Sequence, residues 1–81
     1  MAQTHGLFKR VGRRLAQLRR WRGFNQEDLA GKAGISRTYL GALEAGMKAA
    51  SLKVYDRLAN ALGVKLPALF DEPDAEHARS R

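Results

Sequence analysis

Residues 26–45 read QEDLAGKAGISRTYLGALEA, and this stretch decides the fold that we expect. Apolar residues recur at helical spacing on both sides of Gly34, which indicates two short helices. We expect the first over residues 26–33 and the second from its N-cap Ser36 to about Ala45. Glycine tolerates the positive φ that a short, steep turn between two helices requires. The stretch therefore predicts two helices held at a steep angle.

The second of these helices has one apolar face and one face with almost no side chains. Leu40 and Leu43 point inward, and Tyr39 flanks them. The opposite face begins beside Arg37 and continues with small residues: Thr38, Gly41, Ala42 and Ala45. A solvated helix more usually carries long charged residues there, whereas a helix that approaches a surface closely needs small ones. This face predicts insertion into a groove; packing of its small residues against another protein helix is the alternative.

Residues 7–22 predict an amphipathic helix that packs against this pair. Its apolar stripe consists of Phe8, Val11, Leu15 and Leu18. The other face is basic and carries Lys9, Arg10, Arg13, Arg14 and Arg20. A transit peptide or a membrane-surface helix is the alternative for such a segment. The following helices need a packing partner, which favours a place in the folded domain.

Arg19 breaks the pattern of this helix because it lies inside the apolar stripe, four positions after Leu15. An unpaired buried charge is very costly, so Arg19 requires an acidic partner. The candidate acids are Glu27, Asp28 and Glu44.

The remaining chain predicts two more helical segments. Residues 51–62 place five apolar residues on one face: Leu52, Tyr55, Leu58, Ala59 and Leu62. Residues 66–70 predict a last apolar turn that forms either a core lid or a dimer patch. We expect residues 1–6 to be a flexible arm and residues 71–81 a flexible charged tail, so that the folded domain spans residues 7–70.

Composition limits the classes of function. The 81 residues are enough for one small domain, and the net charge is +7. Residues 1–70 carry 13 Lys or Arg against 4 Asp or Glu, which favours a polyanionic partner such as nucleic acid. There is no cysteine, and His5 and His77 lack partners at ligand spacing, so we expect no metal and no cofactor. With no apolar run of membrane length and no signal peptide, we expect a cytoplasmic protein without a membrane partner.

Several residue patterns combine along residues 7–70. They are Leu15, Leu18 and Arg19; Gln26; Leu29-Ala30; Gly34-Ile35-Ser36; Leu40, Leu43 and Glu44; Gly46; Leu58-Ala59; Leu62-Gly63-Val64; and Leu69-Phe70. Together they resemble the helix-turn-helix domain of the Cro and phage-repressor family of bacterial transcription regulators. The run from Ser36 to Leu40 also looks like the recognition helix of restriction–modification controller proteins. The resemblance implies an all-α, lambda-repressor-like domain of five helices that binds double-stranded DNA.

The resemblance also implies roles for individual residues. It pairs Arg19 with Glu44 and assigns a phosphate clamp to Asn25 and Gln26. The residues expected to read bases, with Ser36 at the helix start, are Arg37, Thr38, Tyr39 and Ala42. A position partly inside the core explains Tyr39 equally well. Lys48 and Lys53 would hold the DNA backbone from the other side. We expect a homodimer through Leu66, Leu69 and Phe70, with part of the helix over residues 51–62, that binds an inverted-repeat operator. Family members often carry proline where this chain has Ala50. The missing proline predicts a looser link over residues 47–50, before the helix over residues 51–62.

Three rival classes remain to be compared. An enzyme is disfavoured because paired carboxylates, a histidine–nucleophile pair and a metal cluster are all missing from the sequence. An antitoxin would need a toxin-binding segment, and residues 71–81 are short and polar. A helical interaction domain that never binds DNA does not account for the bare face of the helix over residues 36–45. The sequence does not decide whether RNA polymerase or a toxin contacts this protein.

Overall fold

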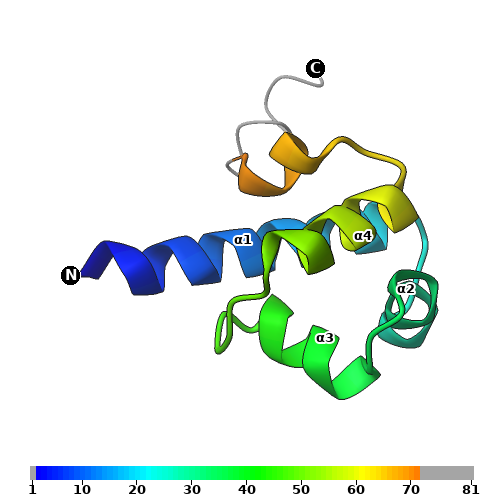
Figure 1. Ribbon diagram of the computed structural model, residues 1–81, viewed down its shortest axis with the longest axis horizontal. Coiled ribbons are helices and arrows are strands. Elements are labelled where there is room, and N and C mark those ends of the chain that lie inside the picture. Colours follow the sequence, from blue (N-terminus) through cyan, green and yellow to red (C-terminus); the bar gives the residue numbers. More distant parts are fainter. Residues whose placement is uncertain (1, 72–81) are drawn as a thin grey trace.

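The computed structural model describes residues 2–71, with the backbone alone for residues 2–5, and contains no strand in that range. Its elements are α1 (Ala2–Trp21), α2 (Gln26–Ala33), α3 (Arg37–Glu44), α4 (Leu52–Leu62) and the 3₁₀ helix η1 (Leu66–Phe70). In Figure 1, α1 runs along the molecule and α4 lies in front of it, with α3 on one side and η1 on the other. None of these helices is both long and apolar enough to cross a bilayer. The all-α class is confirmed.

The two short helices begin at the residues that the sequence predicts, and α3 ends one residue before the predicted end. The side chain of Asn25 accepts the Asp28 N–H at 2.7 Å, and the Asp28 carboxylate accepts the Asn25 N–H at 3.2 Å. This reciprocal capping box starts α2. The hydroxyl of Ser36 accepts the Tyr39 N–H at 3.0 Å and starts α3. Between the two helices, Gly34 has φ +74°, so the turn uses the conformation that glycine adopts most readily.

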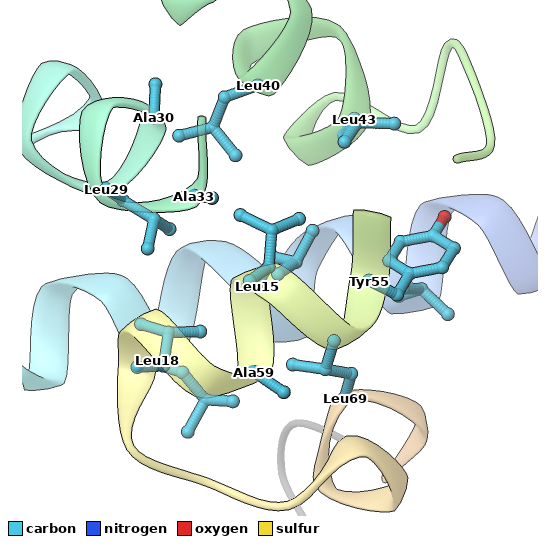
Figure 2. Close-up of a cluster of buried hydrophobic side chains, with 13 residues drawn as sticks. Leu15, Leu18, Leu29, Ala30, Ala33, Leu40, Leu43, Tyr55, Ala59 and Leu69 are labelled. Atoms are coloured by element: carbon cyan, nitrogen blue, oxygen red, sulfur yellow. The ribbon is translucent and has the colours of Figure 1, made fainter. Parts of the chain in front are cut away.

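Every element contributes a leucine to a single core. Leu15, Leu29, Leu40, Leu58 and Leu69 are all 0% exposed, and they come from α1, α2, α3, α4 and η1 in that order. Figure 2 shows Leu15 between α1 and α4, with Leu29 and Leu40 pointing toward it. Burial of a leucine contributes about 1.5–3 kcal/mol. The core therefore fixes how α2 and α3 sit against α1 and α4.

The first and the last element differ most from the predicted ones. α1 begins at Ala2 instead of residue 7, so the arm expected over residues 1–6 is helical from Ala2 onward; Met1 lies outside the described residues. The extension needs no new packing, because each residue added to an existing helix forms another backbone hydrogen bond. The expected fifth helix is a 3₁₀ helix, since it is only five residues long and Pro67 has no N–H to donate. Of the predicted tail, only Asp71 is described.

The apolar face of α4 is shorter than predicted. Leu52 is 65% exposed, whereas Tyr55, Leu58, Ala59 and Leu62 are buried. Leu52 is the first residue of α4 and lies one turn before Tyr55, the first residue of α4 that is buried. The N–H of Ala50 donates to the Tyr55 hydroxyl at 3.2 Å, so the preceding link covers Tyr55 and leaves Leu52 outside.

Arg14 does not belong to the exposed basic face on which the sequence placed it. It is only 1% exposed, and its Nε donates to the Ala68 carbonyl at 2.8 Å. Its Nη1 donates to Gln17 Oε1 at 2.9 Å, and its Nη2 lies 3.9 Å from Asp71 Oδ2. A buried guanidinium is tolerated only when its N–H groups have partners. Arg14 therefore joins α1 to η1.

Candidate nucleic-acid interface

The first turn of α3 is the exposed part of that helix. Ser36, Arg37 and Thr38 are exposed, whereas Leu40 and Leu43 on the opposite face are 0% and 1% exposed. In Figure 1, α3 lies at the edge of the molecule, on the side away from η1. Because the inner face of α3 is buried, the part of α3 that faces solvent is its short polar first turn, which carries the guanidinium of Arg37.

The bare surface of α3 is narrower than the sequence predicted. Ala45 is exposed, but Gly41 and Ala42 are half-buried. A Cβ built on Gly41 would lie 3.8 Å from the side-chain nitrogen of Gln26, so Gly41 faces the start of α2. Because the Gln26 side chain already lies over Gly41, little of Gly41 is left to pack against another protein helix. The part of the face that is open to a partner consists of Arg37, Thr38, the edge of Ala42, and Ala45.

The start of α2 lies next to the start of α3 and completes a shallow, open pocket. Its lining residues are Arg19, Asn25, Gln26, Glu27 and Arg37. The first turn of a helix exposes N–H groups and the positive end of its dipole, both of which favour an anion. The fold therefore brings together three of the predicted site residues: Asn25, Gln26 and Arg37.

A chain of polar contacts links this pocket to the interior. Arg19 and Glu44 form a two-point ion pair, with Nε–Oε2 at 2.7 Å and Nη2–Oε1 at 3.1 Å. Their side chains are 12% and 7% exposed, and Arg19 Nη1 also donates to the Phe24 carbonyl at 3.0 Å. Gln26 Nε2 donates to Glu44 Oε1 at 3.0 Å, and Gln26 Oε1 accepts from Arg37 Nη1 at 3.5 Å. Of the three candidate acids, Glu44 is the one that faces Arg19.

The far end of α3 carries a second basic group. The Nζ of Lys48 lies 6.0 Å from the centre of the Tyr39 ring, and Lys48 is exposed while Tyr39 is half-buried. Tyr39 packs against the core cluster, so one side of its ring is used inside the domain. Lys53 is exposed on the first turn of α4. The N–H of Ala50, which a proline would lack, holds the preceding link on Tyr55.

The residues predicted for a dimer lie on the opposite side of the molecule, in and around η1. The prediction is wrong for Leu69, which is 0% exposed because it fills the core between η1 and α4. Figure 2 shows Leu69 pointing toward α4 beside Ala59. Leu66 and Phe70 are half-buried, and the Phe70 ring meets the Tyr55 ring edge-on at 5.9 Å. Leu66 and Phe70, together with the exposed Leu52 one turn before Tyr55, are the open apolar side chains of η1 and α4, and we call them the η1 patch.

Gly12 was missed by the sequence reasoning, although it supports the interface. It is buried in α1 at the place where α1 meets the end of α3. A Cβ built on it would overlap the Leu43 carbonyl oxygen and lie 2.5 Å from the Glu44 carbonyl oxygen. The signal that could have found it is a lone glycine inside a helix, where glycine costs stability unless packing requires it.

Two short helices joined through a glycine turn, the second exposed along a basic first turn, define a DNA-binding domain of the helix-turn-helix class. Residues 15–69 match the family model described as helix-turn-helix. The chain belongs to this family of DNA-binding transcription regulators.

Named relatives agree with this membership. The chain is 41% identical over 66 residues to y4dJ, an uncharacterised HTH-type transcriptional regulator of Sinorhizobium fredii, covering 82% of this chain and 86% of that protein. It is 37% identical over 62 residues to the immunity repressor of Bacillus phage phi105, covering 76% of this chain but only 43% of the repressor. One of these relatives is named as a transcriptional regulator and the other as a repressor. The phage repressor confirms the resemblance to the Cro and phage-repressor family.

A solved structure gives the same result. The restriction–modification controller protein C.AhdI from Aeromonas hydrophila superimposes with a TM-score of 0.77 at 38% identity. The alignment covers 78% of this chain and 96% of the controller protein. The likeness to controller proteins that the run from Ser36 to Leu40 indicated therefore extends over most of the fold.

Proposed function

We propose that this protein is a sequence-specific transcription regulator that inserts α3 into the major groove of its operator. The observation that carries the proposal is the exposure pattern of α3: its first turn is open and polar, and its inner face is buried by Leu40 and Leu43. B-DNA admits an α-helix into its major groove, and a first turn that carries an arginine suits both base edges and phosphates.

Arg37 and Thr38 are the main base readers in this proposal. A guanidinium bonds to both acceptors on the groove edge of guanine, and a threonine contacts either polar groups or a thymine methyl. Ala42 lies one turn further on and makes close apolar contact. Tyr39 has a smaller role, because its ring packs partly in the core and lies under Lys48.

The backbone contacts come from both sides of α3. Asn25 and Gln26, together with the amides at the start of α2, bind one phosphate, and Ser36 adds a hydroxyl at the start of α3. Lys48 and Lys53 bind the backbone beyond the other end of α3. Such contacts fix the register of the protein on DNA, whereas base contacts select the sequence.

The proposal includes a symmetric dimer formed through the η1 patch. Two copies would place their α3 helices about 34 Å apart on an inverted-repeat operator. A small domain that exposes apolar side chains gains stability by covering them with a second copy. An antitoxin is the less favoured alternative, because the relatives reported above are named as regulators and as a repressor.

Arg37→Ala is expected to reduce the preference for operator over random DNA by about 5- to 150-fold, the equivalent of about 1–3 kcal/mol. The operator is first obtained by selecting bound sequences from random DNA, and Kd is then measured for both kinds of DNA. Arg37 is exposed and its bond to Gln26 is long, so the melting temperature should stay close to that of the wild type. An unchanged specificity ratio would show that Arg37 does not read bases.

Lys48→Ala is expected to weaken binding to operator and random DNA by a similar factor, because a phosphate contact carries no sequence information. The slope of log K against log salt should fall in magnitude by roughly one unit. Lys65→Ala is the matched control: Lys65 is an exposed lysine and the N-cap of η1, an element that lies on the other side of the molecule from α3 (Figure 1). Equal salt slopes for the two variants would contradict the assignment of Lys48.

A further inference from the structure

Arg14 is almost completely buried, which is unusual for an arginine, and its guanidinium is held there by polar groups. Its Nε donates to the Ala68 carbonyl at 2.8 Å, and its Nη2 lies 3.9 Å from Asp71 Oδ2. These two positions enclose the second half of η1. The contact that reaches η1 itself is to a backbone oxygen, so Arg14 holds the path of the chain there whatever side chain position 68 carries.

η1 depends on such external contacts for its placement. A 3₁₀ helix of five residues has poor hydrogen-bond geometry and little stability of its own. Leu69 anchors η1 in the core, and Leu66 and Phe70 pack against the core beside it, but apolar contact has no preferred direction and sets the orientation of η1 only loosely. A hydrogen bond does have a preferred direction. The bond from Arg14 to Ala68, one residue before the anchor, therefore fixes which side of η1 faces solvent.

That solvent side carries the apolar groups of the η1 patch. With Ala68 turned toward α1 and Leu69 toward the core, Leu66 and Phe70 remain partly open. The Phe70 ring is then placed edge-on against Tyr55 of α4, one turn after the exposed Leu52. The patch thus consists of residues from two elements, and its shape depends on how η1 is oriented on α4.

We propose that Arg14 is a positioning residue for the dimer surface. It orients η1 so that Leu66 and Phe70 join Leu52 in one surface that a second copy of the chain covers. This inference rests on the proposed dimer. Arg14 is only 1% exposed, so it acts on the dimer through η1 and not through a surface of its own.

The test compares Arg14→Met with Arg13→Met. Both changes remove one positive charge from neighbouring positions and leave a long apolar side chain, but Arg13 is exposed. Sedimentation velocity should show the dimer Kd raised by about tenfold or more in Arg14→Met relative to Arg13→Met. Affinity for a single half-site should be equal in the two variants, whereas affinity for the inverted repeat should be lower in Arg14→Met. Equal dimer Kd values in the two folded variants would overturn the inference.

A second measurement separates this inference from the proposed dimer. The NMR contact between the Tyr55 and Phe70 rings should be present in the wild type and in Arg13→Met and lost in Arg14→Met. If the wild type is a monomer at every concentration, the proposed dimer is wrong, and this ring contact alone decides the role of Arg14. If Arg14→Met does not fold, Arg14→Lys and Arg13→Lys replace the pair, because one ammonium cannot reproduce the planar fork that spans Ala68 and Gln17. An unchanged dimer and an unchanged ring contact in Arg14→Lys would overturn the inference.

Discussion

Arg19→Ala is expected to lower the free energy of unfolding by about 3–5 kcal/mol, the usual cost of removing one partner from a buried ion pair. The substitution leaves the Glu44 carboxylate, which is 7% exposed, with Gln26 as its remaining donor. Glu44→Ala should cost a similar amount, because Arg19 would keep only its bond to the Phe24 carbonyl among the contacts described above. For a domain of this size, such a loss is a large fraction of the total stability.

The control for this prediction is Arg20→Ala. Arg20 is the next residue of α1 and is exposed, so its loss should change the stability by no more than about 0.5 kcal/mol. The double variant Arg19→Met/Glu44→Leu should recover most of the stability, since apolar residues of similar volume often replace a buried pair without loss. Urea unfolding of the wild type and the four variants measures these differences. A melting temperature that neither single substitution lowers would contradict the prediction.

The ion pair also has a consequence for DNA binding. It joins α1 to the last residue of α3, and Gln26 connects it with Arg37 at the first residue of α3. The double apolar variant would restore the packing but not this connection. We therefore expect it to fold well and still to discriminate less between operator and random DNA. The comparison distinguishes the contribution of the pair to stability from its contribution to the orientation of α3.

The helix-turn-helix unit could be predicted from the sequence because its signals are local. Asn25 and Ser36 are caps whose partners lie three residues away, and Gly34 marks the turn. The need of Arg19 for an acid followed from its spacing to Leu15, although spacing alone left three candidate acids open. The resemblance to the family selected Glu44, and the geometry agrees.

Arg14 shows why the same reasoning failed nearby. It lies three residues after Val11 and four before Leu18, both of which are buried, so its spacing was as informative as that of Arg19. Its partner in η1 is the Ala68 carbonyl, 54 residues away, and a backbone oxygen leaves no mark in a sequence. Leu69 was placed in the dimer surface for a related reason, since an apolar residue in a short terminal turn fits a lid and a patch equally well.

Gly12→Ala is expected to destabilise the protein by about 1–3 kcal/mol, the range for overpacking a filled core. In most helices the same substitution stabilises, because alanine is favoured over glycine by about 0.5–1 kcal/mol. Here the added methyl group would overlap the Leu43 carbonyl oxygen and lie 2.5 Å from the Glu44 carbonyl oxygen. These are backbone atoms, so the clash is relieved only if the end of α3 moves away from α1.

Gly31→Ala in α2 is the matched control, since nothing lies within 4 Å of a Cβ built there and Gly31 does not have a positive φ. Urea unfolding should therefore give changes of opposite sign: a loss for Gly12→Ala and a gain of about 0.5–1 kcal/mol for Gly31→Ala. Because α3 must shift in the first variant, its operator affinity should also fall at temperatures where it is fully folded. The prediction is wrong if Gly12→Ala is as stable as the wild type and binds the operator equally well. The close approach at Gly12 would then not hold α3 against α1, and the Arg19–Glu44 ion pair would be the contact that sets the angle of α3.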